Sequence, residues 1–307
     1  MRFLTTEEIE DLDSVRQIIT DTGIKARILE RLPGGARSFA FGADNLCIRF
    51  PKAEVIWKTM QREKQIIDAV YPHIDEKLPG RVHKIELIAE EYPFSVSKRF
   101  SGKICDNRGE GEYTTGYTAL SGLQQENLAR QVAKFFAGMH AIDYETLNIP
   151  PVDGEIAGAM ESWNVSKRPD YDHDEVKSAL MKYSADKLNL DDFNSEKTEV
   201  IEALCHNDLS GSNMLIEPDS YQLLNGVIDF GNARIVPIAE DFFPLYKVDR
   251  KLAIDTLKIY NKIVTHPLSQ ITIDNIALQY IGYGLAKSTG DPQPYFLRLL
   301  QMFLRDE

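Results

Sequence analysis

Two polar clusters in the second half of the chain contain the residues best suited to catalysis. In LCHNDLSGSNMLI (204–216), Asp208 precedes Asn213 by five residues, and in GVIDFGNA (226–233), Asp229 follows a short apolar run. Apolar residues flank both clusters, so we expect them at strand ends or in tight loops. Phosphoryl transfer requires a carboxylate that takes a hydroxyl proton, together with oxygen ligands for Mg²⁺. The clusters therefore predict Asp208 as catalytic base and Asn213 and Asp229 as magnesium ligands.

The order and spacing of these residues say more than any one of them alone. The segment from His206 to Asn213 follows the H-x-D-L-x-x-x-N pattern of kinases, and a DFG tripeptide follows it. Either motif by itself is an ordinary turn or cap. Together they make the chain resemble the aminoglycoside phosphotransferases and, more widely, the small-molecule kinases with a protein-kinase-like fold. The resemblance implies a hydroxyl acceptor, ATP or GTP as co-substrate, and Mg²⁺.

The same resemblance assigns residues near the motifs. In the antibiotic kinases a D-P-x-x-D element follows the DFG segment, and Asp241 matches its last aspartate, whereas Val236 replaces the first. We therefore expect Glu240 and Asp241 to bind substrate. AGMHAI resembles the family's L-H element, and its His140 is expected to be structural.

The N-terminal residues predict how the nucleotide phosphates are held. LPGGARSFAFG reads as a hairpin whose backbone N–H groups can approach phosphates, or as a plain hairpin, and by resemblance Ser38 lies at this loop. NLCIRFPK aligns with the family strand that carries a phosphate-binding lysine, but this chain has Arg49 there, and the two residues are not interchangeable. Glu63 on the next helix is the expected ion-pair partner. The alternatives are a surface charge on a strand and a solvated helix charge.

The segment SVSKRFSG (95–102) matches the hinge between lobes in position. By resemblance, backbone groups of Lys98, Arg99 and Phe100 are expected to bind adenine or guanine. The side chains do not indicate which base is bound.

The pattern of elements predicts a bilobed, protein-kinase-like α+β fold. Residues 1–100 alternate a helix (6–20), short strands (26–50), a helix (53–71) and more strands, which predicts a small β-rich nucleotide-binding lobe with a hinge near 97–102. Residues 101–307 predict a larger, mainly helical lobe for catalysis and substrate binding. A cleft between two lobes is a common ligand site.

Charge is distributed unevenly between these two parts. Residues 1–100 have 16 basic and 16 acidic side chains, so the net charge of −12 lies entirely in residues 101–307. Such a field repels nucleic acid and anionic membranes and attracts a cation, although it also serves solubility. We expect a small cationic substrate and no nucleic-acid or membrane partner. Three widely spaced cysteines and the lack of a signal-peptide pattern predict a cytoplasmic protein with reduced thiols.

The sequence thus predicts magnesium-dependent transfer of a γ-phosphate to a hydroxyl of a small cationic molecule, with an aminoglycoside antibiotic as first choice. The acidic insert 153–195 would form the substrate floor together with the acidic pair at 240 and 241. Two alternatives remain open. One is a kinase for another small alcohol, such as a macrolide, choline or a sugar amine. The other is a pseudokinase that binds nucleotide and acts by interaction; Arg49 favours it and the intact set of Asp208, Asn213 and Asp229 opposes it.

Overall fold

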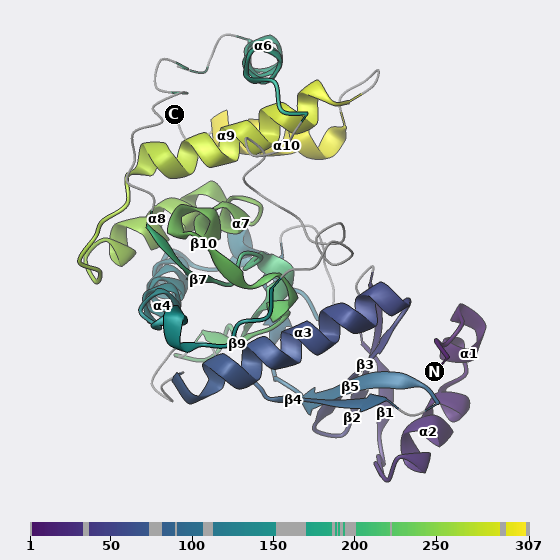
Figure 1. Ribbon diagram of the computed structural model, residues 1–307. Coiled ribbons are helices and arrows are strands. Elements are labelled where there is room, and N and C mark those ends of the chain that lie inside the picture. Colours follow the sequence, from purple (N-terminus) through teal and green to yellow (C-terminus); the bar gives the residue numbers. More distant parts are fainter. Residues whose placement is uncertain are drawn as a thin grey trace.

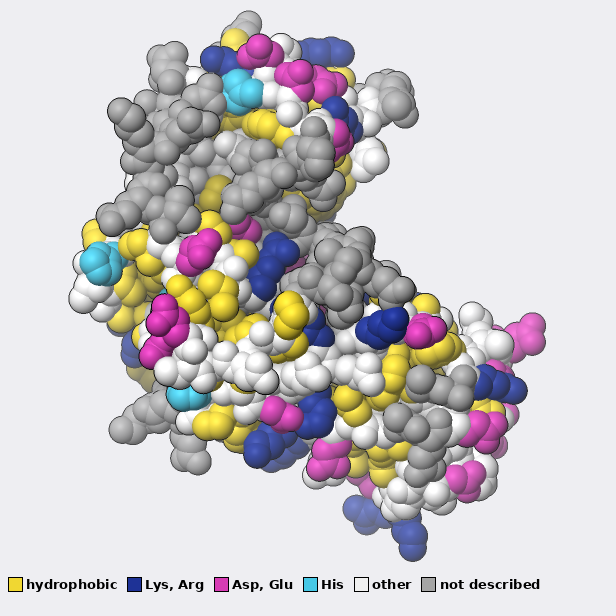
Figure 2. Space-filling model, viewed as in Figure 1, with side chains coloured by type: hydrophobic (Ala, Val, Ile, Leu, Met, Phe, Trp, Pro, Cys, Tyr) yellow, Lys and Arg dark blue, Asp and Glu magenta, His cyan; other side chains and the backbone are white. Residues whose placement is uncertain are grey.

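The structure is a computed structural model of the 307-residue chain, and it has two lobes, which the ribbon (Figure 1) and the space-filling view (Figure 2) both show. It describes residues 2–32, 37–73, 82–89, 91–106, 113–151, 170–185, 188, 190, 193, 201–221, 223–288 and 293–304. The smaller lobe contains an antiparallel sheet, and the larger lobe is mainly helical, so the predicted α+β bilobed fold is confirmed.

The sheet of the small lobe has five strands in the order β1-β2-β3-β5-β4. Their bounds are β1 Leu29–Arg31, β2 Ser38–Ala43, β3 Leu46–Pro51, β4 Ile85–Ala89 and β5 Pro93–Lys98. Phe41 and Ile48 from one face of this sheet join Ile9, Val15 and Ile19 in a buried cluster, which packs the N-terminal helices on the sheet. This burial leaves the opposite sheet face for function.

The N-terminal helical segment is divided in two, which differs from the single helix expected over residues 6–20. Helix α1 (Thr6–Glu10) begins with a capping box formed by Thr5 and Glu8. Helix α2 (Leu12–Asp21) begins immediately after, because the carboxylate of Asp11 accepts a hydrogen bond from the backbone of Asp13. An aspartate in this role favours a new helix start over continuation of the old one.

The functional face of the sheet follows from its register. Glu30 pairs with Gly42, Gly42 with Cys47, and Arg49 with Ser95, so these side-chain positions share one face. Helix α3 (Glu54–Val70) contacts this sheet and also the large lobe, and Figure 1 shows it running between the two. Strand β5 ends at Lys98, and the chain then enters the large lobe.

The large lobe is built on long helices that bury aromatic side chains. Helix α4 (Gly122–His140) packs on α8 (Arg250–Tyr260), and α6 (His173–Ser184) packs on α9 (Gln270–Ala286). Its other helices are α7 (Phe243–Tyr246) and α10 (Pro294–Leu304). Its strands form the sheet β6-β8-β9 (Lys103–Ile104, Met214–Ile216, Leu224–Val227) and the pair β7-β10 (Glu202–Cys205, Arg234–Pro237). One 3₁₀ turn follows α3 at Tyr71–His73, and others lie in the large lobe at Tyr117–Ala119, Tyr144–Thr146, Gly211–Asn213, Phe230–Asn232 and Ile238–Phe242. Among the described residues, no helix is both long enough and apolar enough to cross a bilayer.

Candidate active site

The loop after β7 carries Asp208 and is fixed by an internal histidine. The Nδ1 atom of His206 accepts a hydrogen bond from the Asp208 backbone (3.3 Å), and its Nε2 donates to the carbonyl of Ile228 (3.1 Å). Burial lowers the pKa of His206 and keeps its ring neutral. A neutral imidazole has one nitrogen that accepts and one that donates, as these two bonds require. The ring therefore ties the Asp208 loop to the strand that precedes Asp229.

The carboxylate of Asp208 is oriented by an amide that sequence reasoning missed. The Nδ2 atom of Asn232 donates to Asp208 Oδ2 (3.1 Å), and Asn232 is only 4% exposed. This bond fixes the direction of the carboxylate of the half-buried Asp208. The signal available in the sequence was an amide side chain on the turn three residues after Asp229.

The two residues expected to hold magnesium lie side by side. The backbone N–H of Ile228 donates to the carbonyl of Asn213 (3.1 Å), which places the next residue, Asp229, beside Asn213. The Asn213 Nδ2 donates to the Asp208 carbonyl (2.8 Å), so the carboxamide oxygen is the side-chain atom left for a cation. A carboxylate and a carboxamide oxygen form a donor set that fits Mg²⁺.

Asp229 has an unusual backbone conformation that bears on this site. Its φ of 65° lies in the left-handed region, which Asp tolerates better than most residues. A Cβ added at Gly231 would lie 3.3 Å from Asp229 Oδ1. The carboxylate therefore lies against the Gly231 backbone.

Arg49 and Glu63 form the ion pair expected from the sequence. The Arg49 Nη2 lies 2.5 Å from Glu63 Oε2, and Glu63 Oε1 accepts a hydrogen bond from the backbone of Phe230 (3.1 Å). Burial alone would lower the pKa of Arg49, but the carboxylates of Glu63 and Asp229 outweigh it and hold that pKa above its ordinary value. Arg49 therefore stays charged next to the proposed metal ligand.

A second side chain of α3, Arg62, holds the same loop and was not predicted. Its Nη1 donates to the carbonyl of Gly231 and its Nη2 to that of Ala233, both at 2.8 Å. Arg62 is 3% exposed. With Glu63 bonded to Phe230, adjacent residues of one helix hold both ends of the turn after Asp229.

Asp241 has a different role from the one expected, and this is a correction. It is fully buried; one carboxylate oxygen accepts the backbone N–H of Asn207 (2.5 Å), and the other accepts that of His206 (3.1 Å) and Nε2 of His140 (3.0 Å). Two backbone N–H groups at a tight turn require an acceptor, and Asp241 supplies it. It anchors the Asp208 loop and does not face a substrate.

Two other expectations concern the same region. Glu240 is 2% exposed and its Oε2 lies 3.9 Å from Arg234 Nη2, so it too is buried and its expected contact with substrate is corrected. His140 is structural, as expected, because its Nδ1 also bonds the hydroxyl of Tyr260 (2.9 Å). Of the insert 153–195, the structure describes only residues 170–185, 188, 190 and 193.

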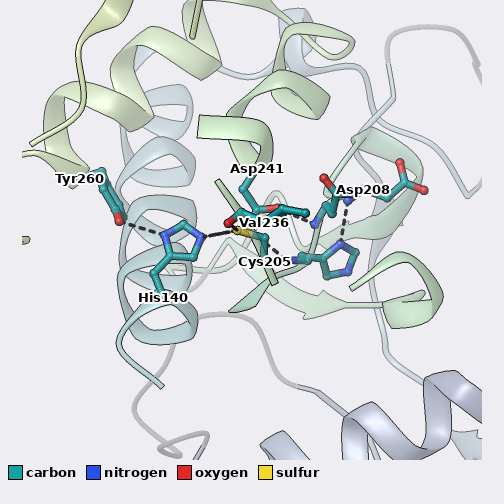
Figure 3. Close-up of polar contacts among 8 residues, drawn as sticks. His140, Cys205, Asp208, Val236, Asp241 and Tyr260 are labelled. Atoms are coloured by element: carbon teal, nitrogen blue, oxygen red, sulfur yellow. Dashed lines mark hydrogen bonds and ion pairs between the residues drawn. The ribbon is translucent and has the colours of Figure 1, made fainter. Parts of the chain in front are cut away.

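His140, Cys205 and Asp241 place their donor atoms within 4.8 Å of one another, as a metal site would (Figure 3). However, Cys205 Sγ bonds the carbonyl of Val236 (3.7 Å), and burial raises the pKa of its thiol well above the ordinary value. Metals bind the thiolate, which burial disfavours. His140 and Cys205 therefore pack around Asp241, which anchors the Asp208 loop.

The structure places the remaining nucleotide-binding candidates at the ends of the small-lobe sheet. Ser38 begins β2 on the same face as Ala40, which pairs with Arg49, while residues 33–36 of its loop lie outside the described residues. At the hinge, the carbonyl of Lys98 bonds His83 Nδ1 (2.5 Å), and the N–H of Arg99 donates to the Asn45 carbonyl (2.7 Å).

These two hinge groups were expected to bind the base, and both have partners within the chain. Phe100 is involved as well, because its ring stacks on His83 with 3.6 Å between ring centroids. The His83 ring thus holds the hinge through a bond and a stack. No pattern in the sequence indicates this contact.

The fold is similar to that of known proteins. A family model described as the phosphotransferase enzyme family matches residues 22–262. The GDP complex of wild-type aminoglycoside 2'-phosphotransferase-IIIa is 19% identical, with a TM-score of 0.62 over 96% of this chain and 98% of that chain. The streptomycin–ATP–APH(2")-IIa ternary complex is 19% identical, with a TM-score of 0.57 over 93% and 90%. Macrolide 2'-phosphotransferase MphH from Brachybacterium faecium is 16% identical, with a TM-score of 0.60 over 90% of both chains.

Proposed function

Because the chain belongs to the phosphotransferase enzyme family and phosphorylates a hydroxyl of a small molecule, we propose that its acceptor is a cationic aminoglycoside and its donor ATP or GTP. The observation that carries the proposal is the orientation of Asp208. One of its carboxylate oxygens is held by Asn232, and its backbone carbonyl is held by Asn213. A base fixed in this way is suited to one acceptor direction.

Asp208 acts on the acceptor hydroxyl. Its carboxylate accepts the hydroxyl hydrogen, and the oxygen of the acceptor attacks the γ-phosphorus as the bond to the β-phosphate oxygen breaks. The products are a phosphate monoester, a nucleoside diphosphate and the proton first held by Asp208. His206 and Asp241 keep the loop in place during this step.

Arg49 and the two oxygen ligands act on the donor. Magnesium, when held by Asn213 and Asp229, would neutralise charge on the phosphates. Arg49 supplies positive charge from the facing lobe, and Glu63 fixes its direction through the 2.5 Å contact. Ser38 would lie near the phosphates at the tip of the β2 hairpin.

The charge of the large lobe supports a cationic acceptor. The net charge of −12 arises entirely from residues 101–307. The burial of Glu240 and Asp241 removes the two acidic residues first chosen for the floor, and this observation favours a second candidate, an apolar macrolide. Both acceptor classes occur among proteins of similar fold.

A substrate panel tests the proposal directly. The purified protein is assayed with ATP and with GTP against aminoglycosides, macrolides, choline and amino sugars, at low and high salt. Phosphorylation of aminoglycosides with a KM that rises with salt is expected, because salt screens charge pairs over about 10 Å at 0.1 M. A KM that does not change with salt, together with phosphorylation of macrolides, would support the second candidate. Nucleotide binding with no phosphorylated product from any acceptor would support the pseudokinase.

A further inference from the structure

The sheet face that carries Arg49 continues toward the hinge. Near the hinge this face carries an ion pair between Glu30 and Arg99. Glu30 on β1 pairs in register with Gly42 on β2, and Gly42 pairs with Cys47, two residues before Arg49. Glu30 therefore lies on the face of the sheet that holds the phosphate-binding arginine. The hinge residue Arg99 reaches this face, because its Nη1 donates to Glu30 Oε1 at 2.5 Å.

Gly42 makes room for that side chain. A Cβ at this position would lie 2.4 Å from Arg99 Nη1 and 3.1 Å from its Cζ. Gly42 has no positive φ, so its backbone does not require glycine, but a side chain at this position would displace the guanidinium. The guanidinium thus lies against the backbone of β2, on the side that faces the large lobe.

The ion pair is reachable by a ligand. The side chain of Arg99 is 27% exposed and that of Glu30 is 38% exposed, compared with 3% for the buried Glu63. Arg99 and Tyr113, but not Glu30, line an open pocket of about 580 Å³ at the hinge. That volume is in the range of small-molecule sites.

Both side chains keep bonding capacity. A guanidinium has five N–H donors, and a carboxylate has about four lone-pair sites. In this cluster Glu30 accepts one bond from Arg99 and one from the hydroxyl of Tyr113 (2.8 Å). The bond from Arg99 holds the pKa of Glu30 below its ordinary value, so the carboxylate is ionised and acts only as an acceptor.

We propose that Glu30 and Arg99 read the purine base of the nucleotide by side chain and select guanine over adenine. One edge of guanine presents the O6 acceptor next to the N1–H and N2–H₂ donors. A guanidinium next to a carboxylate presents the complementary order of donor and acceptor. Adenine offers an amino donor and a ring acceptor in the opposite order and lacks the second donor.

The hinge backbone supports this assignment. The carbonyl of Lys98 and the N–H of Arg99 are already bonded to His83 and Asn45, respectively, so two groups that would otherwise bind a base have partners. Side chains then carry the recognition. The inference rests on the proposed nucleotide-dependent phosphotransfer and adds the identity of its donor.

Calorimetry on the full-length protein with Mg²⁺ tests the inference with four nucleotides: GDP, ADP, and the inosine and xanthosine diphosphates. The wild type should bind GDP at least about tenfold more tightly than ADP, and more tightly than the inosine nucleotide, which lacks the 2-amino group. Glu30→Gln should lower GDP affinity about 10- to 100-fold, the usual cost of a lost bond to a charged group. It should raise affinity for the xanthosine nucleotide, whose 2-oxo group accepts from the Gln amide.

Two further variants separate recognition from folding. Gly42→Ala places a methyl group against Arg99 and should lower GDP affinity while ADP affinity stays the same. Asp68→Asn is the matched control, because it breaks the exposed pair with Lys64 on α3, away from the sheet face. It should change none of the four affinities. Thermal unfolding verifies that every variant is folded.

Equal affinity of the wild type for GDP and ADP would overturn the inference and leave the proposed phosphotransfer in place. A Glu30→Gln effect of equal size on both nucleotides would do the same, because it would show a general and not a base-specific role. If the folded wild type bound none of the four nucleotides, both the inference and the proposed function would fail.

Discussion

The Arg49 guanidinium and the Glu63 carboxylate lie 2.5 Å apart, and the second oxygen of Glu63 bonds the backbone of Phe230. Arg49→Ala should therefore raise the nucleotide KM or lower kcat clearly. Glu63→Ala should be at least as harmful, because it removes the ion-pair partner of the partly buried Arg49 and also frees the loop at Phe230. Arg49→Lys should keep partial activity, since the charge remains and the fork geometry is lost.

A double-mutant cycle on kcat/KM measures this coupling. The single variants and the double variant are compared at saturating acceptor, and the coupling energy should exceed about 0.5 kcal/mol. Strictly additive effects would mean that the two residues do not act together.

Asp208→Asn should remove most turnover and leave nucleotide affinity nearly unchanged, because the base acts only on the acceptor. Loss of a general base usually costs about 10²–10⁴ in rate. Single-turnover kinetics and nucleotide calorimetry measure the two quantities separately. More than a tenth of wild-type kcat in the purified variant would contradict the assignment.

We expect Asn232 to affect turnover by positioning Asp208, without affecting nucleotide binding. Asn232→Ala frees the Asp208 carboxylate and should lower kcat about tenfold with little change in nucleotide affinity. Asn232→Asp puts a like charge next to the base and should raise the pKa of Asp208, which moves the acidic limb of the kcat profile to higher pH. A pH profile identical to that of the wild type would show that Asn232 does not position the base.

The free energy of unfolding should decrease as pH decreases, because His206 is buried and neutral in the folded protein. Burial lowers its pKa, so the unfolded chain binds the proton first and the free energy of unfolding decreases as pH falls below about 6.5. The loss ends when pH passes the lower pKa of the folded state. Urea unfolding of the wild type and His206→Asn between pH 5 and pH 8 measures this, and the variant should show the smaller slope. The exposed His266→Asn is the control and should keep the wild-type slope.

Asp241→Asn tests the anchor of the catalytic loop. The amide has one acceptor oxygen where the carboxylate has two, so either the Asn207 N–H or the His206 N–H loses its partner. We expect a loss of about 1–3 kcal/mol in the free energy of unfolding, together with a fall in kcat. An unchanged substrate KM would agree with an anchoring role, whereas a large rise in aminoglycoside KM with unchanged stability would restore the role in substrate binding.

The relative positions of the proposed catalytic residues could be predicted because these residues are close in sequence. Asp208, Asn213 and Asp229 lie within two short loops joined by a pair of strands, so their spacing in sequence fixes their spacing in space. The Arg49–Glu63 pair was also predictable, since a strand and the following helix lie next to each other along the chain.

Contacts between distant segments could not be predicted in this way. Arg62 bonds carbonyl groups 169 and 171 residues away, and nothing in its helix indicates which loop it meets. Asp241 was misplaced for a related reason. An acidic side chain suggests exposure, and only the tertiary structure brings two backbone N–H groups to its oxygens.

The bonds from Arg62 and Glu63 to residues 230–233 have a consequence for how the two lobes are held together. Each bond joins a side chain of α3 to the backbone of the turn after Asp229 within the same polypeptide. Folding of the chain therefore aligns α3 with that turn, and movement of one lobe is transmitted to the residues next to Asp229.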